Sequence, residues 1–319
     1  MKLTELSFDA MGTHAHVVIG DCAPEHAALA LGAVDRLERI WSRFIPESEI
    51  SRANAAPGEP VEVSPETIEL VDRAVEAWDL TGGLFDPTVL GDLVALGYDR
   101  TFRELETLPP QEPAGTEDLQ ASAPQPRERP DVSVDREAST ITVGPRGIDS
   151  GGIGKGLAAD IVAAMLIDAG AGAALVNLGG DLRTAGVAPS GGWLVDVAHP
   201  FNRGGPPAGK FRLDGQALVT SSSQGRRWSK DGEENHHLLD PSTGKSALSD
   251  LALVTVIDSE GWRAEALSKA AFLKGRAAAL EMLPAHGAEG MVVGRDGSVE
   301  WTAGCRPFRV PEKLVARRR

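Results

Sequence analysis

The chain has 319 residues, of which 42% are hydrophobic and 24% charged, so its composition is that of a folded globular protein and excludes an intrinsically disordered one. With 32 basic and 46 acidic side chains, its formal net charge is -14, which argues against non-specific binding to DNA or RNA. There are two cysteines and no apolar run long enough for a membrane span or a signal peptide. We therefore expect a cytoplasmic protein without a disulfide framework.

The first third of the chain carries the patterns of one strand and two helices. Alternation of polar and apolar residues over 14–19 predicts a strand. Apolar residues at steps of three and four from Ala30 to Phe44 predict an amphipathic helix. A second helix is predicted to begin at Pro65, with Ser64 as its N-cap, and to end at Gly82. The core-facing residues of this second helix are predicted to be Ile68, Val71, Val75 and Trp78.

Residues 107–131 are rich in Pro, Glu, Gln and Ser, which is typical of a linker or a surface excursion. We therefore expect three parts: an N-terminal part at 1–106, this segment, and a C-terminal part at 132–319. In the C-terminal part, the patterns predict strands at 140–143, 174–178, 193–197 and 253–257 and helices at 155–168 and 262–273. Because helices and strands intermix, the fold class is predicted to be mixed α/β or α+β.

A glycine-rich segment, IDSGGIGKGLAAD from Ile148 to Asp160, precedes and opens the helix predicted at 155. Glycines let the backbone come close to a ligand, and a helix N-terminus together with Lys155 offers donors and positive potential to a phosphate. The spacing matches neither the dinucleotide-binding fingerprint nor the P-loop. Taken alone, the segment indicates either a phosphate site or a plain glycine-rich turn.

Other short motifs have structural explanations when each is taken singly. LFDPT, from Leu84 to Thr88, is typical of a loop closed by an Asp-Pro turn. NLGGD, from Asn177 to Asp181, is typical of a strand that runs into a turn. The pair at 236–237 consists of two histidines that either supply a ligand or proton acceptor or belong to a strand edge.

In their order along the chain, these motifs resemble those of the ApbE family, the FAD:protein FMN transferases. The matching blocks are MGT at 11–13, Phe44 with SEISRAN at 48–54, GLFDPT at 83–88, the segment at 149–160, NLGGD at 177–181, TS at 220–221, HHLLDPSTG at 236–244 and VTV at 254–256. The resemblance implies an α/β protein of two joined lobes with FAD in the cleft between them. It also implies an enzyme that cleaves the FAD pyrophosphate with Mg²⁺ and attaches FMN through a phosphoester to a Ser or Thr of a partner flavoprotein.

The resemblance further implies roles for individual positions. Catalysis would involve His237 beside the flavin, Lys155 near the phosphates, and Asn54 close to the metal and the pyrophosphate. The metal ligands would be the carbonyl of Gly152 and the carboxylate of Glu265. The residues expected to contact FAD are Met11, Phe44, Leu84, Phe85, Asp86, Asp149, Lys155, His237 and Leu238.

The block at 264–269 departs from the family pattern, in which an Asp and a Thr four residues apart ligate Mg²⁺. This chain has Glu265 and Lys269 there. An ammonium group has no lone pair with which to bind a metal, and it repels a cation. Three alternatives follow: the two residues form an ion pair and the metal site is gone, Lys269 itself replaces the cation, or Mg²⁺ still binds through Glu265, Gly152 and waters.

The same departure leaves alternatives for the activity. The leading hypothesis is an FMN transferase. The alternatives are a degenerate member of the family that binds FAD without transfer and one that hydrolyses FAD to FMN and AMP.

Overall fold

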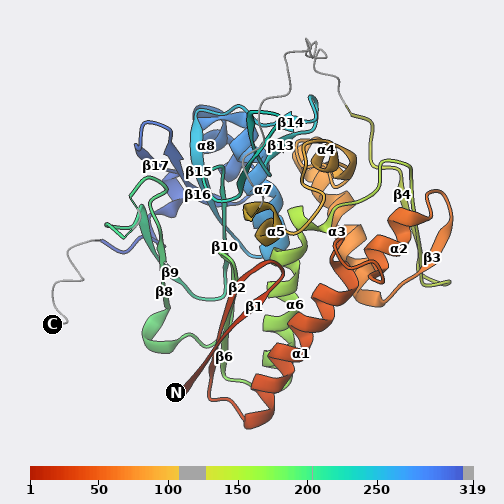
Figure 1. Cartoon of the computed structure of the whole chain (residues 1–319). Helices are drawn as coiled ribbons and strands as arrows, with labels where there is room; N and C mark the ends of the chain where they lie inside the picture. Colours follow the sequence, from red (N-terminus) through yellow and green to blue (C-terminus); the bar gives the residue numbers. More distant parts are fainter. Residues whose placement is uncertain (108–126, 203, 312–319) are drawn as a thin grey trace. The chain divides into compact units, whose positions relative to one another are not determined.

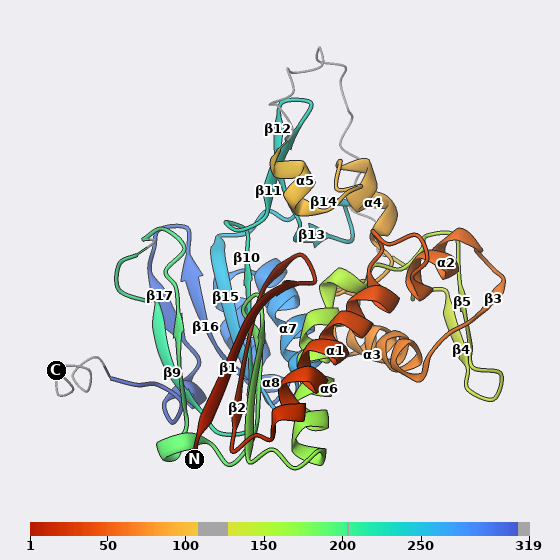
Figure 2. The same cartoon turned by 60° about the horizontal axis from the view of Figure 1, so that its bottom comes forward.

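The computed structural model describes residues 1–107, 127–202 and 204–311 (Figures 1 and 2). The chain divides into two compact units: unit 1 comprises Met1–Val34, Lys155–Ser222 and Ser249–Arg319, and unit 2 comprises Asp35–Gly154 and Ser223–Leu248. The segment at 107–131 does not separate these units, because residues on both of its sides belong to unit 2. Most of that segment lies outside the described residues.

Unit 1 is built on an eight-stranded sheet with the order β1-β2-β6-β7-β10-β15-β16-β17, in which every neighbouring pair is antiparallel. The interior strand β15 is buried along its whole length, as expected for a strand covered on both faces. The strands are β1 (Leu3–Ala10), β2 (Thr13–Gly20), β6 (Ala173–Leu178), β7 (Asp181–Gly186), β10 (Ala217–Ser222), β15 (Leu251–Asp258), β16 (Glu289–Gly294) and β17 (Val299–Trp301).

Helices cover one face of this sheet, and a hairpin covers the other. The helix α7 (Gly261–Lys274) packs on β10 and β15, and α8 (Arg276–Ala285) packs on β16 (Figure 1). On the opposite face, the hairpin of β8 (Trp193–Val197) and β9 (Gly209–Leu213) shares an apolar core with the sheet. Short 3₁₀ turns lie at Pro189–Gly191 (η2) and Ala303–Cys305 (η3), and α6 (Gly154–Asp168) leads into β6.

Unit 2 is mainly helical and carries small antiparallel sheets. The helix α1 (Pro24–Trp41) starts in unit 1 and ends in unit 2. The sheets are β3-β5-β4, β11-β12 and β13-β14. The elements are α2 (Glu49–Ala55), β3 (Pro60–Glu62), α3 (Pro65–Thr81), α4 (Leu90–Ala95), α5 (Phe102–Glu106), β4 (Val132–Asp135), β5 (Thr140–Val143), η1 (Ser150–Gly152), β11 (Arg227–Lys230), β12 (Glu233–His236), β13 (Leu239–Asp240) and β14 (Lys245–Ser246).

The mixed helix and sheet class predicted from the sequence is confirmed, and one helix boundary needs correction. The helix predicted to run from Ala30 to Phe44 is α1, but it ends at Trp41, so Phe44 lies in the turn that follows. In the described part of the chain, no helix combines the length and the apolar character that crossing a membrane requires.

The helix predicted from Pro65 is α3, and its ends are as expected. The Ser64 side chain accepts a hydrogen bond from the Thr67 amide, and Gly82 ends the helix with a φ of 62°. Its buried face was predicted wrongly, since of the four expected residues only Val71 is fully buried. Thr67 is buried because its hydroxyl bonds to the indole of Trp41, which a hydrophobic pattern cannot reveal. The buried residues are Thr67, Leu70, Val71, Ala74, Ala77 and Thr81.

Candidate functional site

Two tight turns lie side by side at one end of the unit 1 sheet. The β1–β2 hairpin turns through Met11 and Gly12, with φ values of 51° and 65°, and the β6–β7 hairpin turns through residues 179–180, with φ values of 70° and 101°. Two-residue hairpins of this kind need positive φ at both central positions. A Cβ atom on Gly179 would lie 2.2 Å from the hydroxyl oxygen of Thr13. The motifs MGT and NLGGD are therefore neighbours in the fold.

Four charged side chains form a cluster beside these turns, which we call the charged cluster. It consists of Lys155 in the first turn of α6, Asp181 at the start of β7, and Glu265 and Lys269 on α7. The Lys155 ammonium contacts the Asp181 carboxylate and lies 3.0 Å from Oε1 of Glu265. The Lys269 ammonium lies 3.1 Å from the same oxygen. Asp181 was not among the residues predicted for the site, although its place directly after a double glycine at a strand end was a usable signal.

The charged cluster is electrically balanced and mostly buried. The Glu265 side chain is fully buried and that of Asp181 is 5% exposed, whereas the lysine side chains keep 17% and 18% exposure. Burial by itself raises the pKa of Glu265, but Lys155, Lys269 and a hydrogen bond from the Gly156 amide outweigh it and hold that pKa at about 2. Burial raises the pKa of Asp181 and lowers that of Lys269, and neighbouring opposite charges limit both shifts.

Two glycines allow α6 and α7 to cross closely enough to build this cluster. A Cβ atom on Gly156 would lie 2.4 Å from the carbonyl oxygen of Gly261. The crossing places the Gly156 amide 2.8 Å from Oε2 of Glu265. Asp160 caps α7 by accepting the amides of Gly261 at 2.8 Å and Trp262 at 3.1 Å. Burial raises the pKa of Asp160 to about 6, and these amides oppose that shift.

The TS motif at 220–221 fixes the turn of α7 that carries Glu265. The hydroxyls of Ser221 and Ser268 lie 2.7 Å apart, and both serines are buried. The Ser268 hydroxyl also donates to the carbonyl oxygen of Glu265 at 2.8 Å. This motif therefore positions the charged cluster from β10.

In unit 2, hydrogen bonds of Asn54 and of Asp149 to the backbone join three of the sequence motifs. Nδ2 of Asn54 donates to the Ile148 carbonyl at 2.9 Å, and its Oδ1 accepts the Ile148 amide at 2.8 Å. The next residue, Asp149, donates its amide to the carbonyl of Pro87 at 2.8 Å. The blocks SEISRAN, LFDPT and the start of the glycine-rich segment are thus brought together, and Asn54 positions the backbone that leads to Asp149.

Arg43, which was not among the predicted site residues, links two predicted FAD contacts, Phe44 and Asp149. Its Nε lies 3.0 Å from Oδ1 of Asp149, and its guanidinium lies 4.2 Å from the ring centre of Phe44 and 4.7 Å from that of Tyr98. Tyr98 in turn packs against Trp228, with ring centres 5.2 Å apart. Cation–π contacts and an ion pair therefore hold an aromatic surface in place. No local spacing could reveal the contacts of Arg43 with Tyr98 and Asp149, because both residues are distant from it in sequence.

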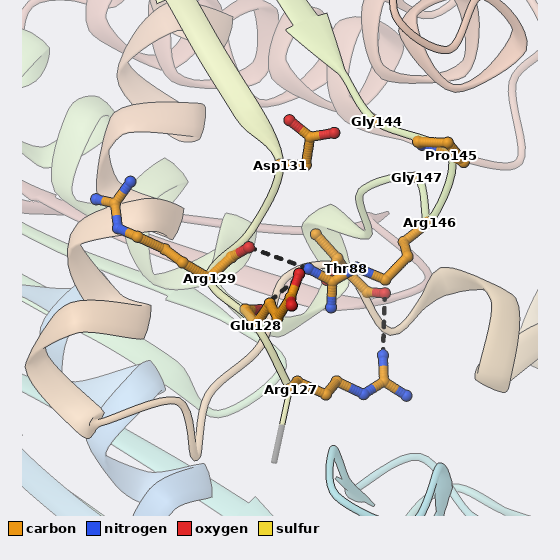
Figure 3. Close-up of a pocket in the computed structure, with 9 residues that line it drawn as sticks. All are labelled: Thr88, Arg127, Glu128, Arg129, Asp131, Gly144, Pro145, Arg146 and Gly147. Carbon is orange, nitrogen blue, oxygen red and sulfur yellow. Dashed lines mark hydrogen bonds between the residues drawn. The ribbon is translucent and has the colours of Figure 1, made fainter. Parts of the chain in front are cut away.

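Asp86 is held by partners within the protein. Its Oδ1 accepts the amide and hydroxyl of Thr88 at 2.8 and 2.6 Å, and its Oδ2 lies 3.7 Å from Arg127 and 3.5 Å from Arg146. These two arginines line a cavity of about 400 Å³, in which Arg127 donates to the Thr88 carbonyl and Arg146 donates to the carbonyls of Glu128 and Arg129 (Figure 3). Among its neighbours in the loop, Phe85 is buried and Leu84 is half-buried. Contact of these three loop residues with FAD stays a prediction.

His236 ends β12 and His237 follows it, and the two differ in their surroundings. His236 is buried with its Nε2 3.2 Å from the carbonyl oxygen of Ala247. His237 is half-buried, and Leu238 is buried with its carbonyl accepting the Ala247 amide at 2.8 Å. The structural explanation fits His236. The roles of His237 and Leu238 toward FAD stay predictions.

The residues around Glu265 do not fit a magnesium ion. Mg²⁺ prefers about six oxygen ligands at about 2.0–2.1 Å in octahedral geometry. Both carboxylate oxygens of Glu265 already accept N–H donors, two of which are on cationic groups. Across the described ranges, no three His, Cys, Asp or Glu side chains are grouped so that they could hold a metal ion. Gly152 lies in η1 of unit 2, and its carbonyl as a ligand stays a prediction.

Comparisons with known proteins agree with the resemblance in the sequence. A protein named FAD:protein FMN transferase from Treponema pallidum is 29% identical over 270 residues, which cover 79% of this chain and 73% of that protein. One of the same name from Klebsiella pneumoniae is 30% identical over 230 residues, covering 71% and 68%. The crystal structure of the ApbE protein from Thermotoga maritima matches with a TM-score of 0.81 at 29% identity, covering 97% of this chain and all of that one. The sequence model of the ApbE family matches residues 11–292, and this chain belongs to that family.

Proposed function

We propose that this chain is an FAD:protein FMN transferase, which moves FMN from FAD to a Ser or Thr hydroxyl of a partner flavoprotein. Membership of the ApbE family and the name of its relatives support the activity. The structural observation that carries the proposal is the charged cluster, in which Lys155 stands in the first turn of α6 beside the turns of two family motifs. A helix start with a fixed ammonium group is suited to phosphate oxygens.

The reaction exchanges one phosphorus–oxygen bond for another. The oxygen of the acceptor hydroxyl forms a bond to the phosphorus of the FMN phosphate, while the bond from that phosphorus to the bridging oxygen breaks. AMP leaves with the bridging oxygen and both electrons of the broken bond. Since negative charge is spread over the phosphate oxygens in the transition state, cationic groups fixed beside them lower the barrier.

In this proposal each residue predicted for catalysis or for FAD binding keeps a role. Lys155 binds phosphate oxygens, and the half-buried His237 accepts the proton of the acceptor hydroxyl. Asn54 acts by positioning residues 148–149. The residues proposed to contact FAD remain Met11, Phe44, Leu84, Phe85, Asp86, Asp149, Lys155, His237 and Leu238. A cytoplasmic location stays a prediction.

The test is transfer to a separate protein. The purified chain is incubated with FAD and a flavoprotein domain that carries a Ser/Thr flavinylation motif, and denaturing gels are scanned for flavin fluorescence. We expect covalent label on the acceptor with one AMP released per label, and no label when the acceptor hydroxyl residue is changed to Ala. Release of AMP without label would indicate FAD hydrolysis, and FAD binding with neither product would indicate a binding protein. Either result contradicts the proposal.

A pair of lysine variants tests the role of the charged cluster in this reaction. Lys155→Met is expected to lower the transfer rate by about 100-fold or more, because it removes a charge from the transferring phosphate. Lys274→Met changes an exposed lysine at the end of α7 and serves as the matched control, with a rate close to that of the unchanged protein. Equal rates for Lys155→Met and the unchanged protein would exclude Lys155 from the site.

A further inference from the structure

We infer that Lys269 supplies a permanent cation in the place of a divalent metal, so that this chain transfers FMN without a metal ion. The inference rests on the proposed function and concerns how negative charge on the pyrophosphate is compensated. It develops from the misfit between the charged cluster and a magnesium ion, and it selects the second of the three alternatives that the sequence left open.

N–H donors of the protein already occupy both carboxylate oxygens of Glu265. Oε1 lies 3.0 Å from the Lys155 ammonium and 3.1 Å from the Lys269 ammonium. Oε2 accepts the Gly156 amide at 2.8 Å. A carboxylate has about four acceptor positions, and N–H donors of the protein occupy three of them, including both on Oε1. Lys269 therefore stands where a ligand would be needed, and it offers only donors.

The formal charges of the charged cluster cancel one another in a mostly buried place. The formal charges of Glu265 and Asp181 are cancelled by those of Lys155 and Lys269. Before a pyrophosphate binds, a divalent cation added to this set would leave two uncompensated positive charges in surroundings where charge is poorly solvated. Without the Lys269 charge, the set would carry one net negative charge, which a cation could compensate. The lysine is thus the difference between a set that repels a metal ion and one that attracts it.

The lysine side chains are the part of the charged cluster that a ligand from solvent meets first. The carboxylates are the buried part of the charged cluster, since Glu265 is fully buried and Asp181 nearly so. The lysine side chains are the part that keeps contact with solvent. Phosphate oxygens would therefore meet ammonium groups, and a metal ion would have to pass them to reach a carboxylate. The carboxylates act by holding the ammonium groups in place.

The Lys269 cation is held in a fixed place by its own helix and by the neighbouring elements. Lys269 follows Glu265 by one helical turn, the favourable order for such a pair. The turn of α7 between them is fixed by the hydroxyls of Ser268 and Ser221 at 2.7 Å. The start of α7 is fixed by its crossing with α6 at Gly156. A cation held in this way needs little reorganisation when charge develops in the transition state.

The first measurement compares transfer with and without metal ions. The full chain is freed of metals on a chelating resin, and the rate of FMN transfer is measured in excess EDTA and in excess MgCl₂. We expect the two rates to agree within about two-fold, as they should if the cation belongs to the protein. Loss of transfer in EDTA with recovery in MgCl₂ would overturn the inference and leave the proposed function intact.

The second measurement does not depend on activity. Mn²⁺, as a paramagnetic probe, is titrated into the protein with FAD, and free Mn²⁺ is followed by electron paramagnetic resonance. We expect the unchanged protein with FAD to bind no more Mn²⁺ than FAD alone. One tightly bound Mn²⁺ per chain would overturn the inference, even if transfer to every acceptor tested were absent and the proposed function had failed.

Variants show whether the lysine is the cause. In Lys269→Thr, alone or with Glu265→Asp, we expect one Mn²⁺ per chain and transfer that falls by about 100-fold in EDTA and recovers in MgCl₂. Lys269→Arg keeps the charge and should stay insensitive to EDTA, and Lys274→Thr on the exposed end of the same helix is the matched control. If Lys269→Thr does not fold, the two measurements on the unchanged protein still decide the question.

Discussion

The ammonium of Lys269 lies 3.1 Å from Oε1 of Glu265, one helical turn earlier on α7, and the Glu265 side chain is fully buried. A charge buried in this way is stable only while its partners remain, because its own desolvation is costly. The pair is therefore a structural unit as well as part of the proposed site, and the two roles can be measured separately.

Replacing Glu265 with Gln is expected to lower the free energy of unfolding by about 3–5 kcal/mol, because it leaves two ammonium groups in a buried place with one carboxylate. Urea unfolding followed by circular dichroism measures the change. The matched control is Asp35→Asn, which breaks the pair of Asp35 with Arg39 on α1, also four residues apart but exposed. Its effect should stay below about 1 kcal/mol. Similar losses for both variants would contradict the buried pair.

Replacing Gly156 with Ala is expected to destabilise unit 1 by about 1–3 kcal/mol, because the added methyl group would meet the backbone of Gly261 and push α6 and α7 apart. The same variant should weaken FMN transfer, since the Gly156 amide bonds to Glu265. Gly32→Ala in α1 is the control, because no atom lies near its added methyl group. It should gain about 0.5–1 kcal/mol from higher helix propensity, and thermal unfolding distinguishes the two signs.

Replacing Asn54 with Ala is expected to cost about 1–3 kcal/mol, because the Ile148 amide and carbonyl lose their partner. Hydrogen exchange should show the consequence locally, as faster exchange of the Ile148 amide. We also expect weaker binding of FAD, since the same backbone leads to Asp149. Asn202→Ala, in an exposed turn of unit 1, is the control and should leave exchange at Ile148 unchanged. Unchanged exchange at Ile148 in Asn54→Ala would rule out the positioning role.

The pair of Arg36 on α1 and Glu66 on α3 predicts a pH dependence of stability. Arg36 donates to both carboxylate oxygens at 3.0 and 3.1 Å, and this hydrogen bonding lowers the pKa of Glu66 below its usual 4.5. A lowered carboxyl pKa in the folded state stabilises above the unfolded value and is lost as the pH falls through the folded value. Arg36→Gln should therefore cost up to about 1 kcal/mol at pH 7. In urea titrations the difference from the unchanged protein should shrink as the pH falls below 4.5; a constant difference at every pH would refute the pair.

Local features were predictable because they depend on neighbours in sequence. The N-cap at Ser64 and the end at Gly82 follow from capping chemistry, and the strand predicted at 14–19 is β2. The buried face of α3 was not predictable, because the polar Thr67 is buried through a bond to Trp41. Likewise, the pattern that extended α1 to Phe44 describes side-chain spacing and not where the backbone hydrogen bonds stop.

The sequence by itself determined the family, the mixed fold class, and which positions carry Lys155, Glu265 and Lys269. It left open what Glu265 and Lys269 do, because an ion pair, a substitute cation and a modified metal site are all compatible with the same two residues. Only the tertiary structure placed Asp181 and Glu265 against Lys155 and buried both carboxylates more deeply than the lysines. The physical reason is that the energy of a charge depends on burial and on partners from other strands and helices, and spacing along one helix reports neither.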